Sequence, residues 1–491
     1  MHWGRRSLLF IAALVAAAGL APVAGAAATG ADVTASCRDR IGDAPQIGER
    51  ACRTAEQLAR GFANGCRNLG LNAACNQLDG RRTGPRHIVN YLNTWTHRAL
   101  RLQRGLADNV AFARQSMLHT HNSFNSSVYL PTVTNQDPNQ IYSMADQLDM
   151  DVRAIEMDVH WVASVYGTPR SFGRAVVLCH GNVPARGVHL GCSSDRWFPA
   201  GLNELRHWLL RPENANEVVL LYLENNLDDN KLAHNTAADE LAAGLGDLVA
   251  RPPAGKPCAP LPTSTTPAQL RAAGHRVIIV GNCGPGRWGT WVHERGPASN
   301  WVESGSGPVN EYPGLRGCAA ERARTGAGRA IVRWFEDSTW VSAMAGGSSS
   351  RLTVTEATAM ARCGVTLIGF DQLTPEDPRL AAVVWSWAPG APAAPKGTAA
   401  CAMSSSDGRF RDSGCGDRHP FACMVSPDAW RVTGTEGPWT QGRAACAKEF
   451  PGSTFGVPAS GWENGEVRTA AGGRTPWLNY TDASGNGDWR A

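Results

Sequence analysis

The sequence contains only one long apolar run, and this shortage argues against a protein embedded in a membrane. The run extends from Leu8 to Leu20, follows Arg5 and Arg6, and precedes small residues around Ala24–Ala26, which is the order of an export signal. It is short for an uncleaved anchor, which needs about 20 apolar residues. We therefore expect residues 1–26 to be a cleaved signal peptide, and the mature protein to be soluble and secreted to the periplasm or the exterior.

A strong excess of either charge is also missing. Loss of Arg5 and Arg6 with the signal leaves 45 of the 47 basic residues against 43 acidic ones, a formal charge of +2. This balance provides no polybasic attraction, so nucleic acid is not expected as a partner. With 43% hydrophobic and 18% charged residues, the chain is typical of soluble globular proteins. Its 491 residues suffice for a barrel of about 250 residues and one or two smaller units.

Paired CxxC motifs are absent, which argues against metal binding by cysteine. All 14 cysteines follow the signal, so most are expected to form disulfides outside the cytosol. Four of them lie within residues 31–114, where apolar residues recur at helical spacing: Cys37, Cys52, Cys66 and Cys75. We expect a stapled helical lead-in that packs as a collar on the next unit; a lid or a partner surface is the alternative.

Short apolar runs separated by helical or loop stretches occupy residues 115–384. They are Met117–His121, Val152–Val159, Val176–His180, Val218–Glu224, Val277–Gly281, Ile331–Phe335 and Val365–Phe370. Continuous apolar strands with crossovers between them indicate a parallel sheet covered on both faces. The pattern predicts an α/β fold, a TIM-like (β/α) barrel. An eighth strand is not visible, so incomplete closure stays open as an alternative.

Polar side chains stand at the ends of the first four runs, where barrels carry their chemistry. These residues are His121, Asn122, Glu156, Asp158, His180 and Glu224. Glu156 and Asp158 are two residues apart on a strand and therefore point to the same face. Two such buried carboxylates repel each other unless a cation or a shared proton neutralises them.

The three carboxylates and the Asn122 amide form an all-oxygen set, which suits a hard cation such as calcium or magnesium better than zinc. Two histidines beside such an ion supply a proton acceptor and a proton donor. This combination is suited to the cleavage of a phosphodiester.

Four blocks of the sequence resemble the successive strand-end blocks of the catalytic domain of phosphatidylinositol-specific phospholipase C. They are Leu118–Asn125 (LHTHNSFN), Val152–Asp158 (VRAIEMD), Val177–Gly181 (VLCHG) and Leu221–Asn225 (LYLEN). The order and spacing of the blocks agree with that family. The resemblance implies a barrel of the phospholipase C-like phosphodiesterase type, a phospholipid substrate at a membrane surface, and products of diacylglycerol and inositol phosphate.

The calcium-dependent branch of this family has a His-Asn in the first block, a Glu-x-Asp in the second and a Glu in the fourth. By resemblance, Asn122, Glu156, Asp158 and Glu224 bind calcium. The calcium-independent branch has an arginine where Asp158 stands, so Asp158 favours the metal. Arg153 matches a family arginine, and either a catalytic role or a structural ion pair beneath the site is open.

The implied mechanism is attack of the inositol 2-hydroxyl on phosphorus, with calcium acidifying that hydroxyl. His180 would protonate the departing diacylglycerol oxygen. His121 would bind the phosphoryl group or help to take the proton, and a calcium-bound carboxylate is an equal candidate for the base.

Other polar residues near these blocks have weaker claims. His119 and His160 have no assigned family counterpart and are expected to be structural or rim histidines. Glu336, Asp337 and Asp371 follow late strands; contact with the inositol ring is possible, but solvated loop carboxylates are the favoured interpretation.

Residues 385–491 begin with a linker-like stretch rich in proline, alanine and glycine, Ala388–Pro392. The segment from Trp385 to Cys423 resembles the second half of a C-type-lectin-like domain, and Trp439 to Trp489 resembles the first half. A circular permutation would explain this order, and it implies disulfides Cys401–Cys415 and Cys423–Cys446. The sugar-binding signatures of lectins are missing, so a carbohydrate- or protein-binding surface and a purely structural role both stay open for this small α+β domain.

Two other classes compete with the phospholipase hypothesis. Glycerophosphodiesterases and sphingomyelinase D-type enzymes also combine a histidine with a Glu-x-Asp pair and a metal in a barrel, but His121-Asn122-Ser123 favours the phospholipase. An inactive barrel that acts as a binding or adhesion protein is disfavoured, because both histidines and all four potential ligands are present.

Overall fold

The computed structural model describes residues 87–126, 128–129, 138–164, 167, 173–180, 183–185, 188–190, 196–296, 300–303, 312–324, 328–338 and 351–491. The expected signal peptide and the four cysteines of the lead-in lie outside the described residues. Of the helical lead-in, the described part includes helix α5 (Trp95–Ala107), which begins with the Thr94 side chain capping His97 N.

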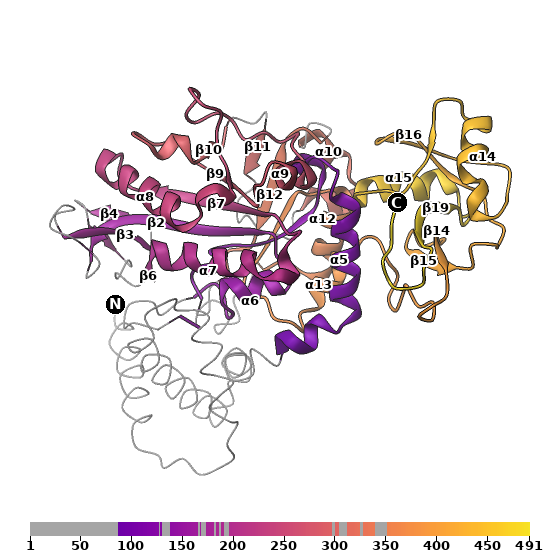
Figure 1. Ribbon diagram of the computed structural model, residues 1–491, viewed down its shortest axis with the longest axis horizontal. Helices are drawn as coiled ribbons and strands as arrows, with labels where there is room; N and C mark the ends of the chain where they lie inside the picture. The colour runs from indigo at the N-terminus through magenta and orange to yellow at the C-terminus, as the bar shows by residue number, and fades with distance from the viewer. Residues whose placement is uncertain are drawn as a thin grey trace, which may run out of the picture.

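The core of the molecule is a curved parallel sheet with helices packed around it (Figure 1). Its strand order is β10 (His293–Glu294), β9 (Val277–Gly281), β7 (Val219–Asn226), β2 (Ala154–Ala163), β1 (Met117–Thr120), β13 (Leu367–Phe370), β12 (Ile331–Phe335) and β11 (Trp301–Glu303). Each neighbouring pair is parallel, and β8 (Val249–Ala250) adds to β9. The predicted α/β architecture is therefore confirmed. Among the described residues no pairing joins β10 to β11, so the expected closed barrel is corrected to a half-barrel.

Helices alternate with these strands along the chain. They are α6 (Met144–Asp149), α7 (Phe198–Leu210), α8 (Lys231–Gly244), α9 (Pro267–Ala272), α10 (Ala319–Arg324), α12 (Val354–Cys363) and α13 (Pro378–Ala382). No helix in the described part of the chain is long and apolar enough to cross a membrane.

Alternation along the strands separates two hydrophobic cores. On β2, Ile155, Met157 and Val159 belong to the large core shared with α6 and α7. Ala154 belongs to a second core with residues of neighbouring strands, including Leu220 and Tyr222. This second core fills the concave side of the half-barrel. Glu156 and Asp158 continue the Ala154 row, so β2 delivers both carboxylates to the concave side.

The third strand does not run as expected. β3 (Arg174–Leu178) pairs antiparallel with β2, with Leu178 opposite Val159, and β6 (Arg196–Trp197) pairs with β3. The predicted parallel third strand is therefore wrong. Because β3 runs back along β2, its end reaches Asp158, whose carbonyl accepts a hydrogen bond from Cys179 N at 3.4 Å. Beyond it, β4 (Val183–Ala185) and β5 (Val188–Leu190) form a separate antiparallel pair.

An ion network fastens α5 beneath the sheet. The buried Asp151 carboxylate accepts hydrogen bonds from Tyr91 Oη at 2.5 Å and from Arg104, and lies 3.0 Å from His97 Nδ1. Arg104 also donates to Glu217, two residues before β7. The described end of the lead-in thus packs at the N-terminal ends of the sheet strands, opposite to the C-terminal ends.

The C-terminal part contains two three-stranded antiparallel sheets. One consists of β15 (Phe410–Ser413), β14 (Ala400–Ser404) and β19 (Trp477–Asp482); the other consists of β17 (Ala429–Val432), β16 (Ala422–Ser426) and β18 (Thr454–Phe455). Helices α14 (Gly442–Glu449) and α15 (Gly461–Ala471) complete it. In Figure 1 this part lies to one side of the half-barrel, next to α5 and α12.

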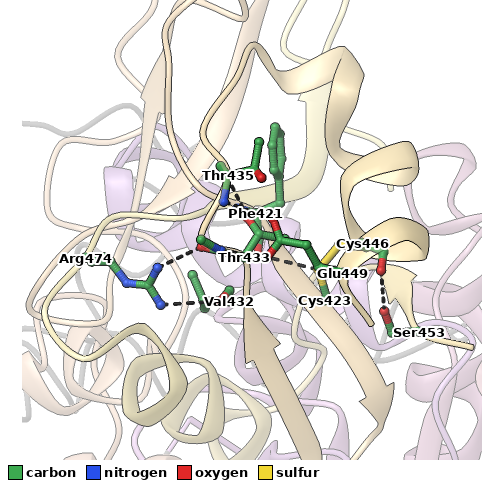
Figure 2. The surroundings of a disulfide bond; sticks show 10 residues. Phe421, Cys423, Val432, Thr433, Thr435, Cys446, Glu449, Ser453 and Arg474 are labelled. Carbon is green, nitrogen blue, oxygen red and sulfur yellow. Dashed lines mark hydrogen bonds between the residues drawn. A yellow bond between two sulfur atoms is a disulfide. The ribbon is translucent and has the colours of Figure 1, made fainter. Parts of the chain in front are cut away.

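Both disulfides implied for this part are present, Cys401–Cys415 and Cys423–Cys446. Figure 2 shows the second one, which joins β16 to α14, and the turn that follows β17. Arg474 donates to the carbonyl of Thr433 at 2.7 Å, and Glu449 accepts from Thr435 N at 2.9 Å. These pairings agree with the prediction, while the lectin-like assignment itself stays a prediction.

The stretch from Ala388 to Pro392 is not a free linker. Trp387 is fully buried and packs against the rings of Phe410 and Trp489. Trp95 of α5 donates its indole N–H to the Ala391 carbonyl at 2.7 Å. The composition of this stretch suggested a flexible connection, but burial of its aromatic neighbour makes it a packed junction.

We expect the double variant Cys423→Ala/Cys446→Ala to destabilise the C-terminal part by about 3 kcal/mol, because the bridge closes a loop of moderate length in the unfolded chain. Hydrogen exchange read by mass spectrometry should show faster exchange in β16, β17 and β18. The matched control is Cys258→Ala/Cys283→Ala, which removes a bridge of similar sequence separation in the half-barrel. Equal exchange of these strands in both double variants would contradict the expectation.

Candidate active site

Three carboxylates meet at the mouth formed by the ends of β2 and β7. The parallel register sets Asp158 opposite Glu224 and Glu156 opposite Tyr222. One carboxylate oxygen of each of Glu156, Asp158 and Glu224 lies within 4.8 Å of the others. Glu156 and Asp158 are buried, whereas Glu224 is half-buried. The structure therefore brings together the three acids singled out in the sequence.

Asn122 adds an amide to these acids, which together form the carboxylate cluster. It follows β1 with a φ of 45°, a left-handed conformation that asparagine tolerates better than most residues, and its backbone N–H donates to Glu156 Oε2 at 3.1 Å. One end of its side-chain amide lies 3.0 Å from Asp158 Oδ2. The other end lies 3.1 Å from Asn139 Oδ1 and 3.2 Å from His180 Nε2.

The cluster has the properties of a site for a hard cation. Burial, followed by the charges of Glu224 and Glu156, raises the pKa of Asp158 well above its usual value. Glu156 Oε1 is buried and has no hydrogen-bond partner among the described residues. A cation coordinated by these oxygens would relieve both the repulsion and the missing contact, and all of the donors are oxygen atoms.

Arg333 is a site residue that the sequence interpretation missed. It lies on β12, buried on the concave side, and donates through one amino group to Glu156 Oε2 and through the other to Glu303 Oε1 at 2.7 Å. Burial alone would raise the pKa of Glu156, but the Arg333 guanidinium holds it well below its usual range. The signal in the sequence was an arginine inside an apolar strand, which is rarely buried without an anionic partner.

His119 belongs beneath the cluster and supports Arg333. Its Nδ1 lies 3.2 Å from the Ala154 carbonyl, and its Nε2 accepts from Arg333 Nε at 3.1 Å. Burial lowers its pKa, and this arrangement suits a neutral ring. His160 is buried two residues beyond Asp158 on β2. Both positions agree with the structural role expected for these histidines.

His121 is paired with Asp371 on the other flank of the mouth. His121 Nδ1 lies 3.4 Å from Asp371 Oδ2, and its ring packs on Phe335 with centroids 4.6 Å apart. Burial favours the neutral ring, but the carboxylates of Asp371 and Glu156 raise the pKa of His121 to about 9. The imidazolium form of His121 is therefore favoured at neutral pH, while burial raises the pKa of its partner Asp371 to about 7.

The interpretation of the late carboxylates as solvated is wrong for two of the three. Asp371 is fully buried and accepts from Ser338 N at 2.6 Å. Glu336 is also fully buried, and its two carboxylate oxygens both accept from Arg379 Nη1, at 2.7 and 2.8 Å. Only Asp337 is exposed. Asp371 and Glu336 therefore contact protein groups instead of water, although their strands end at the mouth.

His180 and Arg153 have different positions relative to the cluster. His180 is exposed and stands beside Asn122, because β3 runs back toward Asp158. Arg153 precedes β2 and donates to Glu217 at 2.7 Å and to the Leu148 carbonyl at 2.7 Å. The structure thus gives Arg153 the ion pair beneath the site that was left open, and does not bring it to the cluster.

Comparisons with known proteins bear on the whole chain. A family model described as the Rv2075c PI-PLC-like domain matches residues 82–377. The uncharacterized protein Rv2075c of Mycobacterium tuberculosis (strain H37Rv) is 36% identical over 448 residues, which cover 87% of this chain and 88% of the relative.

Solved structures give weaker likenesses. The phosphatidylinositol-specific phospholipase C of Listeria monocytogenes is 14% identical, with 56% of this chain and 94% of that chain covered and a TM-score of 0.36. The calcium-dependent phosphoinositol-specific phospholipase C of a Pseudomonas species is 14% identical, with 54% and 91% covered and a TM-score of 0.29.

We expect Asp371→Asn to lower the pKa of His121 from about 9, because the variant removes the anion at its Nδ1 while burial remains. The ring should then be mainly neutral at pH 8, where the wild-type ring is mainly protonated. Nuclear magnetic resonance titration of the His121 side chain in calcium-free protein measures this. Asp488→Asn, in the C-terminal part, is the control and should leave the titration unchanged. A His121 pKa that stays near 9 in Asp371→Asn would refute the assignment.

Proposed function

The chain belongs to the family of the Rv2075c PI-PLC-like domain, and on that premise we propose that it is a phosphoric diester hydrolase of the phosphatidylinositol-specific phospholipase C type. The observation that carries this proposal is the geometry of the mouth. Glu156, Asp158 and Glu224 cluster within 4.8 Å, with Asn122 beside them and His121 and His180 on their flanks. Such a set combines a cation site with groups that can bind an anion and transfer a proton.

The proposed cofactor is calcium. Asn122, Glu156, Asp158 and Glu224 would hold it, and the partnerless Glu156 Oε1 and the raised pKa of Asp158 support this. When bound, the ion would lower the pKa of the attacking hydroxyl and stabilise negative charge on the phosphoryl oxygens. Arg333 keeps Glu156 ionised and therefore ready to act as a ligand.

The two histidines are proposed to have different tasks. His121, protonated and held by Asp371, would bind a phosphoryl oxygen, which is the first of the two roles that its sequence left open. A carboxylate of the cluster would then take the proton from the attacking hydroxyl. His180, exposed at the mouth, would give a proton to the departing glycerol oxygen.

The proposed substrate is a phosphatidylinositol-type lipid at a membrane surface outside the cytosol, cleaved to diacylglycerol and inositol phosphate. Disulfides in both parts of the chain, such as Cys318–Cys363 and Cys401–Cys415, are compatible with export to an oxidising compartment. The C-terminal part is the proposed contact for a carbohydrate or a protein at that surface.

The test of the function is an assay of purified residues 27–491 against phosphatidylinositol, phosphatidylcholine, sphingomyelin and glycerophosphocholine, each with calcium, with magnesium and with a chelator. We expect release of inositol phosphate from phosphatidylinositol with calcium only. Cleavage of choline lipids or a preference for magnesium would instead indicate the glycerophosphodiesterase or sphingomyelinase D class. Turnover of none of these lipids would leave a binding or adhesion protein.

We expect His180→Ala to lower kcat by about 10²–10⁴-fold, the range typical for loss of a general acid. Calcium affinity, measured by isothermal titration calorimetry, should stay within a few-fold of the wild-type value. His207→Ala is the matched control, because His207 is an exposed histidine on α7. Full activity of His180→Ala would remove His180 from the mechanism.

A further inference from the structure

Asn139 is a fully buried residue between the two flanks of the mouth, and the proposed mechanism does not use it. Its backbone is held from both sides. The Asn139 carbonyl accepts a hydrogen bond from Gln372 N at 2.8 Å, and the next residue, Gln140, donates through its backbone N–H to the Asn125 carbonyl at 3.0 Å. Gln140 Nε2 also donates to the His121 carbonyl at 2.7 Å. These hydrogen bonds fix the backbone from which the Asn139 side chain extends.

The partners of Asn139 determine which end of its amide is nitrogen. Its Nδ2 donates to Asp371 Oδ2 at 3.1 Å. That oxygen also accepts the backbone N–H of Ser338 at 2.6 Å, so it acts as an acceptor. At the opposite end, Asn139 Oδ1 accepts from Asn125 Nδ2 at 2.8 Å. Turning the Asn139 amide over would place its oxygen against a carboxylate oxygen.

This assignment in turn orients Asn122. When its amide nitrogen lies toward Asn139 Oδ1, at 3.1 Å, Asn122 donates a hydrogen bond there, whereas an oxygen in that place would repel Asn139 Oδ1. The Asn122 carbonyl oxygen then points at the carboxylate cluster, 3.0 Å from Asp158 Oδ2. The opposite orientation lets Asn122 donate to Asp158 and accept from His180, which suits the side chain without a cation, but it sets the oxygens of Asn122 and Asn139 against each other. A cation among the carboxylates would remove the repulsion at Asp158 and favour the first orientation, in which Asn139 accepts from Asn122.

We propose that Asn139 is a positioning residue that presents the Asn122 carbonyl oxygen to the calcium ion, an inference that rests on the proposed calcium site. Without a cation, the carbonyl faces the Asp158 carboxylate unfavourably; with one, it is a ligand. Partners that orient metal ligands typically contribute about 10–100-fold to metal affinity. Because the same amide binds Asp371, it also connects the calcium site to the partner of His121.

The test is calcium affinity of the full mature chain, measured by isothermal titration calorimetry. Asn139→Leu has a similar size but no polar group, and we expect its dissociation constant to rise by about 10–100-fold. The matched control is Asn214→Leu, which removes a buried amide that donates to the Trp208 carbonyl at 2.8 Å, away from the mouth, and should leave the affinity unchanged.

The outcomes distinguish failure of the proposed calcium site from failure of the positioning role of Asn139. If neither the wild type nor any variant binds calcium, the proposed cofactor fails. If the wild type binds, Asp158→Asn binds weakly and Asn139→Leu binds as the wild type does, the calcium site stands and the positioning role is overturned. Should Asn139→Leu not fold, the shorter Asn139→Ser takes its place with the same expected loss.

Discussion

Repulsion among buried carboxylates is the constraint on which the rest of the mouth depends. Arg333 compensates the negative charge of Glu156, and His121 compensates that of Asp371, so each flank has its own positively charged side chain. Asp158 and Glu224 lie between these flanks, and burial together with the charges of Glu224 and Glu156 makes ionisation of Asp158 costly. A fold that retains this arrangement has a strong tendency to bind a cation or a proton there, and that tendency is what a phosphodiesterase of this type would use.

The same alternation that builds the core also builds the site. On β2, one set of side chains packs toward α6 and α7, while the other set begins with the apolar Ala154 and continues with Glu156 and Asp158. On β12, Ile331 lies in the concave core and Arg333 and Phe335 follow on the same face. The chemistry is therefore mounted on the rigid ends of strands whose other residues stabilise the half-barrel.

Much of this site was predictable from the sequence, because the alternation of side chains along a strand and the position of polar residues after apolar runs indicate which side chains meet. Strand-end polar residues of a parallel sheet converge, so Asn122, Glu156, Asp158 and Glu224 were identified from their places after apolar runs. The direction of β3 was missed, although the connection from Ala163 to Arg174 is short for a parallel crossover. Arg333 was missed and Asp371 was interpreted as a solvated loop carboxylate, because burial of a charge depends on a partner far along the chain, Glu156 and His121 respectively, and no local pattern records such pairings.

The packed junction at Trp387 affects how the protein would meet a surface. The indole of Trp387 sits among Phe410 and Trp489, and α5 is bonded to the same stretch through Trp95. A flexible tether would leave the half-barrel free to tumble after the C-terminal part attached to something. A packed junction transmits orientation instead, so any attachment through β14–β19 would also determine the direction in which the mouth faces.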